Sequence, residues 1–326
     1  MIQTTVVGNY PRIGDRHELQ KLRRALAQRD RGELSGEDLA RVEDEVTREV
    51  LEEQAKAGTS LVTDGQIRWG DAQTYIAGNL EGIKITGLLR YFDSNTYFRQ
   101  PVVEGPVRWK RPILVRDFQF AKEHSSRPVK PVLTGPLTLA RLSSDRHYSS
   151  PETLTCDYAR ALAEEISALE DAGADPIQID EPAAVWWPED AALLEKAIGI
   201  LAGGRKRSRL GLYTYFRGPG KLLGLMDSLP IEILGLDLVA GEGDIDAIEK
   251  SPPRKILSLG ILDARNTKLE DEEERAALAR RLRQATGAEE MYIHPNCGLE
   301  FLPRESAVRK LELLSRIAAR AEQEEK

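Results

Sequence analysis

The sequence predicts an α/β protein folded as a (β/α)8 TIM barrel, with an inserted cap segment after the second strand. Its 326 residues are a usual length for such a barrel with insertions. Short apolar runs alternate with longer helical patterns along the chain, which is typical of parallel strands joined by helical crossovers. Eight such runs can be counted, so a closed barrel is favoured over the alternative, an open doubly wound sheet.

Several of the expected strands are apolar over most of their length, as strands buried on both faces are. The eight expected strands are Thr4–Gly8, Ser60–Asp64, Val129–Gly135, Pro176–Asp180, Leu210–Phe216, Ile233–Val239, Ile256–Leu262 and Met291–His294. The main helices expected around them are Gly36–Ala57, Pro151–Asp171, Leu269–Thr286 and Pro303–Glu325. Ser150 followed by Pro151 is typical of a helix N-terminus, because serine caps free backbone N–H groups and proline is tolerated in the first turn.

One interval breaks the regular alternation. Residues Gln66–Pro128 separate the second and third strands by far more than an ordinary βα loop. The segment is rich in aromatic residues, which fits either an insertion with its own small core or a cap over the barrel mouth, and the two interpretations are compatible. We treat residues 1–326 as a single barrel domain with an insertion at about 66–128.

Composition excludes several classes of function. The net charge of −7 disfavours a dedicated nucleic-acid-binding protein, which is usually basic. No run of 18 apolar residues predicts a transmembrane helix, and the first residues do not resemble a secretory signal. Two cysteines give no disulfide framework. We therefore expect a cytoplasmic protein that acts on a small molecule, with neither nucleic acid nor membrane as a partner.

Polar residues follow the expected strands at the end where barrel active sites form. They are Gly8-Asn9, Asp64-Gly65-Gln66, Thr134-Gly135, Asp180-Glu181, Tyr213-Thr214-Tyr215, Asp237, Asp263 and His294-Pro295-Asn296-Cys297. Asp180 can bind an amine or accept a proton there, and Asp263 is a second candidate catalytic carboxylate. The alternative for Asp180 is a structural carboxylate held by backbone donors, and Glu181 points to the other side of the strand by alternation.

A metal site is a further possibility at this end of the barrel. Cys297, His294 and Asp237 carry donor atoms of the types that zinc accepts, and a tetrahedral site needs three or four of them. The alternative is that Cys297 is a partly buried free cysteine.

Four motifs, in this order, resemble cobalamin-independent methionine synthase over nearly the whole chain. They are Thr4–Pro11, Leu133–Thr138, Gln178–Ala183 and His294–Leu299. The resemblance implies methyl transfer to a thiol such as homocysteine, in methionine biosynthesis. It further implies that Asp180 holds the amino group of homocysteine, that Val7, Gly8 and Asn9 cradle its carboxylate, and that Gln66 stands where the family has a glutamate.

The resemblance has features of both the N-terminal and the catalytic barrel of the family. The family's His-x-Cys zinc pair falls on Tyr213 and Tyr215, its glutamate ligand falls on Asp237, and its late cysteine is kept as Cys297. Tyrosine, with a pKa of about 10, is a poor zinc ligand at neutral pH. The resemblance thus implies a weakened zinc site, with a folate or a corrinoid as methyl donor.

Two other functions remain open at this point. The chain can be a non-catalytic N-terminal-type barrel that partners a separate catalytic barrel, in which case it is not itself an enzyme. It can also be a divergent metal-free enzyme that acts on a small amino acid or thiol with the retained carboxylates.

Overall fold

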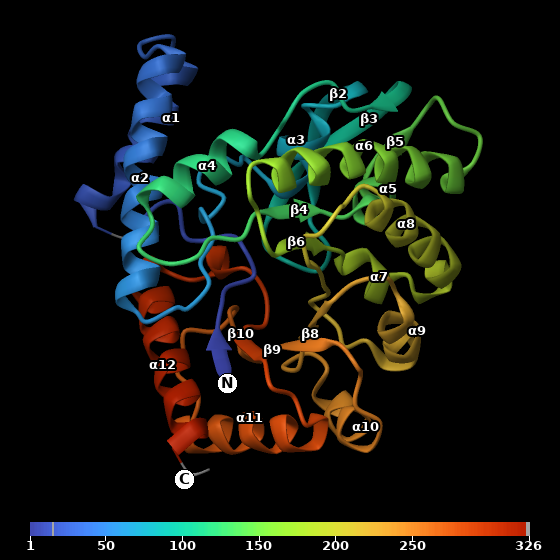
Figure 1. The fold of residues 1–326 in the computed structure, drawn as a ribbon. Helices are drawn as coiled ribbons and strands as arrows, with labels where there is room; N and C mark the ends of the chain where they lie inside the picture. Colours follow the sequence, from blue (N-terminus) through green and yellow to red (C-terminus); the bar gives the residue numbers. More distant parts are fainter. Residues whose placement is uncertain (15, 324–326) are drawn as a thin grey trace.

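Seven parallel strands form one sheet in the order β1-β10-β9-β8-β7-β6-β4 (Figure 1). The computed structural model describes residues 1–14 and 16–323. The strands are β1 (Ile2–Thr4), β4 (Val132–Thr134), β6 (Ile177–Asp180), β7 (Leu210–Tyr213), β8 (Ile233–Asp237), β9 (Ile256–Leu262) and β10 (Met291–Pro295). All seven lie within or directly beside runs that the sequence marks as strands.

The segment around Leu61 and Val62 closes this sheet into a barrel. Leu61 bridges Thr5 and Val62 bridges Val129, both in parallel. The predicted (β/α)8 barrel is therefore confirmed, although the second expected strand, Ser60–Asp64, is reduced to these bridges. The backbone hydrogen bonds to the neighbouring strands stop at Thr63, because the Gln54 side chain bonds to its backbone instead. Thr63 N donates to Gln54 Oε1 at 3.2 Å, and Gln54 Nε2 donates to Thr63 O at 2.9 Å.

Two other strand boundaries differ from expectation for physical reasons. The expected strand Thr4–Gly8 leaves the sheet early, so that its last residues form a loop at the mouth. In the expected strand Val129–Gly135, Pro131 has no N–H to donate, and β4 starts only at Val132.

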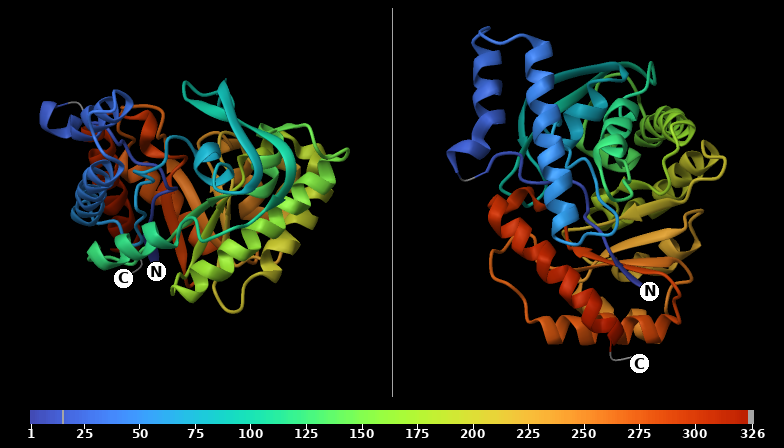
Figure 2. Two further views of the ribbon diagram at one scale, coloured as in Figure 1. Left: turned by 90° about the horizontal axis from the view of Figure 1, so that it is seen from above. Right: turned by 60° about the vertical axis from the view of Figure 1, so that its left-hand side comes forward.

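Helices surround the barrel (Figures 1 and 2). The longer ones are α1 (Lys21–Asp30), α2 (Gly36–Lys56), α6 (Pro151–Asp171), α8 (Ala191–Gly203), α11 (Glu272–Thr286) and α12 (Arg304–Gln323). The shorter ones are η1 (His17–Gln20), α5 (Pro136–Leu142), α7 (Pro182–Trp186), η2 (Pro188–Asp190), η3 (Gly220–Leu222), α9 (Leu223–Ser228), η4 (Glu242–Asp244), α10 (Ile245–Lys250) and η5 (Leu299–Phe301).

The predicted start of α6 is confirmed, because the Ser150 side chain accepts a hydrogen bond from Thr153 N and Pro151 is its first residue. The predicted start of α11 at Leu269 is wrong. The helix begins at Glu272, since the Asp271 side chain accepts from a backbone N–H of its first turn and acts as the N-cap. Glu325, the expected end of the last helix, lies outside the described residues.

The insertion contains α3 (Ala72–Ala77), the strands β2 (Glu81–Arg90) and β3 (Tyr97–Arg108), and α4 (Val115–His124). The strands β2 and β3 form an antiparallel hairpin, to which β5 (Ser144–Asp145) adds in parallel. The hairpin curves along the outside of the barrel and packs on α3 and α6 (Figure 2).

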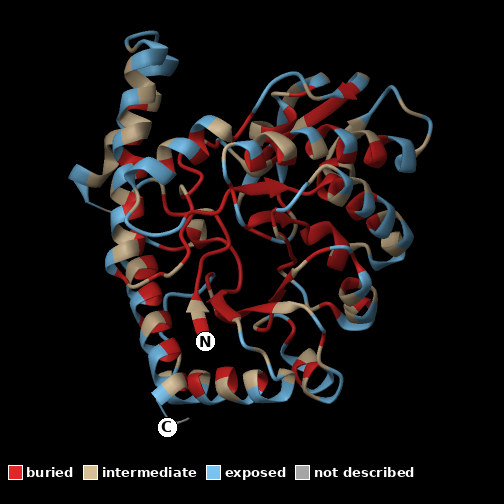
Figure 3. Cartoon of the chain, in the orientation of Figure 1, coloured by how far each residue is buried: buried red, intermediate tan, exposed pale blue. Residues whose placement is uncertain are grey.

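Burial is greatest along the barrel strands and on the inner faces of the helices (Figure 3). In the part of the chain that the structure describes, no helix is both long and apolar enough to cross a membrane.

Candidate functional site

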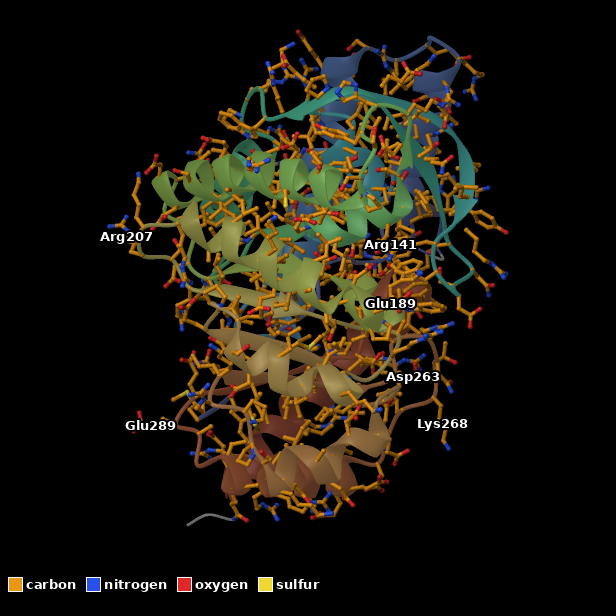
Figure 4. The ribbon with its side chains drawn as sticks, turned by 90° about the vertical axis from the view of Figure 1, so that its right-hand side faces the viewer. Arg141, Glu189, Arg207, Asp263, Lys268 and Glu289 are labelled. Atoms are coloured by element: carbon orange, nitrogen blue, oxygen red, sulfur yellow. The ribbon has the colours of Figure 1, made fainter. Side chains whose placement is uncertain are left out.

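Figure 4 shows the barrel from the side, with residues labelled near each of its two ends. Arg207 and Glu289, which precede β7 and β10, lie on one side of the molecule. Arg141, Glu189 and Asp263, which follow β4, β6 and β9, lie on the opposite side. The carboxyl ends of the strands therefore open on this second side, the barrel mouth, where active sites of this fold are built.

A cavity of about 360 Å³ lies at the mouth, between the loop after β1, the insertion and the loop after β10. Polar and aromatic side chains share its lining, among them those of Asn9, Gln66, Trp69, Tyr91, Phe98 and Glu300. The insertion thus contributes directly to the wall of the cavity, which supports its interpretation as a cap.

The backbone around the mouth is held in unusual conformations. Gln66, Phe92 and Phe216 are the non-glycine residues of the described part with positive φ, at 53°, 49° and 73°. Left-handed backbone is unfavourable for residues with a side chain and is concentrated at functional sites. The fold therefore fixes the direction of these three side chains at some cost in stability.

The loop Val7–Asn9 offers free hydrogen-bond donors. Its carbonyl groups already accept hydrogen bonds from the protein: Gly8 O accepts from Thr63 Oγ1 at 2.8 Å, and Asn9 O accepts from Leu299 N at 2.9 Å. Within the described residues, its backbone N–H groups donate to no acceptor. A Cβ at Gly8 would lie 2.8 Å from Gln66 Nε2, so glycine allows Gln66 to approach this backbone closely.

Asp180 is the last residue of β6, and each of its carboxylate oxygens accepts one hydrogen bond. Oδ1 accepts from Gln178 Nε2 at 2.6 Å, and Oδ2 accepts from the Tyr215 hydroxyl at 3.3 Å. The side chain is 8% exposed, and burial raises the pKa of Asp180 to about 7. Burial thus favours the neutral form of this carboxyl group.

Aromatic rings from the insertion and from loops after the barrel strands contact one another. The Tyr91 ring lies 4.7 Å from Phe92 and 6.1 Å from Phe216, and Phe92 lies 5.4 Å from Trp186. The two contacts of Tyr91 are edge-to-face, an arrangement that is favourable beyond the area that it buries. The cluster joins the insertion to the mouth and supports both interpretations of the insertion, as a segment with an aromatic core and as a cap.

Glu300 is a mouth residue that the sequence did not single out. Its Oε1 accepts from Asn9 Nδ2 at 3.1 Å, while its Oε2 is buried without a hydrogen-bond partner among the described residues. Burial raises the pKa of Glu300 to about 7. The one available signal was its position, directly after the motif that ends in Cys297-Gly298-Leu299.

The barrel interior below Asp180 is polar, which the apolar strand patterns did not predict. Lys130 is 1% exposed, and its Nζ lies 3.4 Å from the Tyr213 hydroxyl and 4.6 Å from the centre of that ring. The Tyr213 hydroxyl in turn donates to Ser258 Oγ at 2.9 Å. Burial lowers the pKa of Lys130 to about 7, since an ammonium group is poorly solvated there.

The three expected zinc ligands do not form a metal site. The Asp237 carboxylate accepts hydrogen bonds from three backbone N–H groups and from Asn296 Nδ2. His294 points into the barrel, where its ring lies 5.4 Å from that of Tyr213, and burial lowers its pKa to about 4. Burial raises the pKa of the Cys297 thiol. Among residues 1–14 and 16–323, no group of three potential ligands is arranged to hold a metal ion.

Asp263, the second expected catalytic carboxylate, lies away from the cavity. Its Oδ1 accepts from Arg265 N at 2.8 Å, and its own N–H donates to Glu270 at 2.7 Å, so it stabilises a turn after β9. Glu181 accepts from the backbone N–H groups of Leu137 and Thr138 at the start of α5, in agreement with its expected place on the other side of the strand.

The structure therefore brings Asn9, Gln66 and Glu300 together around one cavity, and Gln178 links Asp180 to the loop Val7–Asn9. Val7 and Gly8 belong to the same loop as Asn9. Asp237, Asp263 and His294 serve other contacts, and none of them lines the cavity.

Comparison with known proteins by family model, by sequence and by structure points to one family. Residues 77–287 match the model of the family described as "Cobalamin-independent synthase, N-terminal domain". The chain is 29% identical to methionine synthase of Thermococcus kodakarensis over 95% of its own length and 90% of that protein. It is 32% identical to methionine synthase of Sulfurisphaera tokodaii over the same shares. A solved B12-independent methionine synthase from Shewanella sp. W3-18-1, in complex with selenomethionine, is similar with a TM-score of 0.82 and 25% identity over 98% of both chains.

Proposed function

The chain belongs to the cobalamin-independent methionine synthase family, and from this premise we propose that it transfers a methyl group to the thiol of a small amino acid such as homocysteine. The observation that carries the proposal is the cavity at the mouth, which Asn9, Gln66 and Glu300 line and beside which the backbone N–H groups of Val7–Asn9 donate to no acceptor among the described residues. Backbone donors and polar side chains in one place are complementary to the charged groups of an amino acid.

In this proposal the N–H groups of Val7, Gly8 and Asn9 bind the substrate carboxylate. Gln66 lies against the same loop, and a negative charge on Asp180, which Gln178 links to this loop, favours a cationic group in the site. The Shewanella relative is in complex with selenomethionine, the selenium counterpart of the methionine that this reaction forms. That complex supports a methionine-sized ligand here.

The chemistry requires that the thiol loses its proton. A thiol has a pKa of about 8.5, and only its thiolate is a good nucleophile. The sulfur–methyl bond forms while the bond between the methyl group and its donor breaks, and the thiol proton passes to a basic group. Since the donor set of Cys297, Asp237 and His294 does not fit zinc, no step is assigned to a metal. By resemblance, the methyl donor is a folate or a corrinoid.

We propose further that residues 1–326 act as one unit, with the hairpin of β2 and β3 as part of the cap. The aromatic cluster around Tyr91 supports this, because it would hold the insertion over the mouth and shield the substrate from water.

The test is a binding measurement followed by a turnover measurement. Titration calorimetry should show binding of L-methionine and L-homocysteine, and methionine should form when homocysteine is combined with methyltetrahydrofolate or methylcobalamin. Glu189→Gln is a matched control at the mouth, because Glu189 is exposed and does not line the cavity (Figure 4). Binding of neither amino acid would overturn the proposal. Binding without turnover would replace it by a barrel that partners a separate catalytic barrel.

A further inference from the structure

The mouth cavity reaches only one half of the barrel mouth. Its lining comes from the loop after β1, the insertion and the loop after β10, and no residue of the described loops directly after β6 and β7 lines it. The loops of this other half contact the turn that joins β2 to β3, residues 91–96, which we call the tip of the hairpin. Figure 4 shows the hairpin curving toward the side where Arg141 and Asp263 lie, which is the mouth.

Ring contacts and a hydrogen bond hold the tip on the barrel. The Phe216 ring, after β7, lies 6.1 Å from the ring of Tyr91 and 5.8 Å from that of Phe92. Arg265, after β9, donates from Nη2 to Asp93 O at 3.1 Å. Asp93 is exposed, and the net contribution of such a hydrogen bond or ring pair is small. The closure of the tip is therefore weak enough to be reversible.

The hairpin has a point of low resistance to bending below the tip. Between the pairs Ile85–Pro101 and Leu88–Arg99, β2 has two residues and β3 has one, which makes a β-bulge. Pro101 has no N–H to donate, and a Cβ at Gly87 would meet no atom within 4 Å. A bulge that combines an unpacked glycine with a proline can act as a hinge.

We propose that residues 88–99 form a lid that bends at this bulge, lies closed over the mouth in this structure and opens to admit the methyl donor, with Arg265 as its latch. The inference rests on the proposed function for the identity of the ligand. With the lid closed, a small amino acid has the cavity beside the loop Val7–Asn9, while the other half of the mouth is covered. Opening gives the larger methyl donor access to the thiol, and closing then excludes water.

The test is amide hydrogen exchange of the full chain, followed by mass spectrometry. It compares the lid, residues 88–99, with the inner hairpin, residues 81–85 and 101–108. The wild-type lid should exchange faster than the inner hairpin. Arg265→Gln should speed exchange in the lid by about 2- to 10-fold, because one hydrogen bond is lost, and leave the inner hairpin unchanged. Arg217→Gln is the matched control, since Arg217 stacks on Trp186 at 3.8 Å.

Gly87→Ala tests the hinge independently of the latch. Alanine fits at this position, because a Cβ would meet no neighbour, and it restricts the backbone. We expect exchange in the lid to slow by about 2- to 5-fold. Gly243→Ala is the control, since Gly243 is also unpacked but lies away from the hairpin. Equal effects of the two alanines on the lid would contradict a hinge at Gly87.

Other results would overturn the lid itself. Wild-type lid amides that exchange as slowly as those of β8 would show that it does not open. Equal acceleration of the lid and the inner hairpin in Arg265→Gln would show unfolding of the whole insertion, and no acceleration would remove the latch. Association of methyltetrahydrofolate or methylcobalamin should speed up in Arg265→Gln by the same factor as exchange, and an unchanged rate would show that the donor does not pass the lid.

The proposed function fails separately from the lid. Saturating L-methionine should slow exchange in the lid, because the ligand fills the cavity that Tyr91 and Phe98 line. If L-methionine has no effect while Arg265→Gln still speeds exchange in the lid, the lid stands and the amino-acid substrate is contradicted.

Discussion

The side-chain amide of Asn9 donates to the carboxyl group of Glu300 at 3.1 Å, although the two residues are 291 positions apart in the chain. The bond joins the loop after the first strand to the loop after the last one, which are neighbours because β1 pairs with β10. Closure of the barrel thus brings together two residues that line the mouth cavity.

Removal of this bond is expected to weaken substrate binding. In Asn9→Ala the backbone N–H remains, but Glu300 loses its side-chain donor, and its carboxyl group becomes harder to ionise and less well oriented. We expect about tenfold weaker binding of L-methionine, the usual effect of losing a hydrogen bond to a charged group. Calorimetry measures it, with Asn266→Ala as the control, since Asn266 stabilises only an exposed turn. Equal affinities of Asn9→Ala and wild type would contradict the account of Glu300.

The raised pKa of Asp180 predicts a pH-dependent effect on stability. The pKa rises from 3.8 to about 7 on folding, so between these values the folded chain binds more protons than the unfolded chain. Its stability contribution is present below pH 3.8 and is lost as the pH rises through 7. Asp180→Asn should therefore unfold at a higher temperature than wild type at pH 8, with an upper bound of about 4 kcal/mol.

This advantage of Asp180→Asn should shrink as the pH falls toward 4, because the wild-type carboxyl group then becomes neutral as well. Thermal unfolding at a series of pH values checks the prediction. A difference between the two proteins that is the same at every pH would show that the charge of Asp180 is not the cause.

The lowered pKa of Lys130 predicts that its effect on the stability of the fold has the opposite pH dependence. Its pKa falls from 10.5 to about 7 on folding, so between these values the folded chain binds fewer protons and stability rises with pH. Lys130→Met keeps the length of the side chain and removes the buried amine. It should be more stable than wild type at pH 7 by about 1–4 kcal/mol, and the advantage should fade as the pH approaches 10.

Denaturant unfolding at pH 7 and pH 10 measures this difference, and Lys84→Met on the exposed hairpin is the control. If Lys130→Met is less stable than wild type at both values, the contact with the Tyr213 ring outweighs the cost of burying the amine.

The geometry around Cys297 predicts how the protein responds to metal removal. Because Asp237 is saturated with hydrogen bonds and His294 faces the barrel interior, we expect well below one zinc per chain by elemental analysis. The affinity for L-methionine should be unchanged after treatment with a chelator. One zinc per chain that is lost in Cys297→Ser would mean that the side chains rearrange to form a site.

Much of the fold could be predicted from the sequence, because strand patterns and helix caps are local signals. The Ser150-Pro151 start of α6 is an example. The second strand was overestimated because its ladder is replaced by the side chain of Gln54, which lies on a helix earlier in the chain. No local pattern reports such a contact.

The site was harder to predict for the same reason. The loop Val7–Asn9 follows an expected strand and Asp180 ends one, so the order of strands along the chain is enough to place both at the mouth. Glu300 lies in a short turn, and its importance depends on the distant Asn9. Lys130 stands in an apolar run, where only the closed barrel shows that its amine is enclosed beside Tyr213.

A crystal structure of the chain with L-methionine tests the central claim most directly. The account predicts the ligand in the mouth cavity, with its carboxylate at the N–H groups of Val7–Asn9 and its ammonium group on the side of Asp180. A methionine bound elsewhere, or bound in this cavity with its carboxylate away from the loop Val7–Asn9, would contradict it.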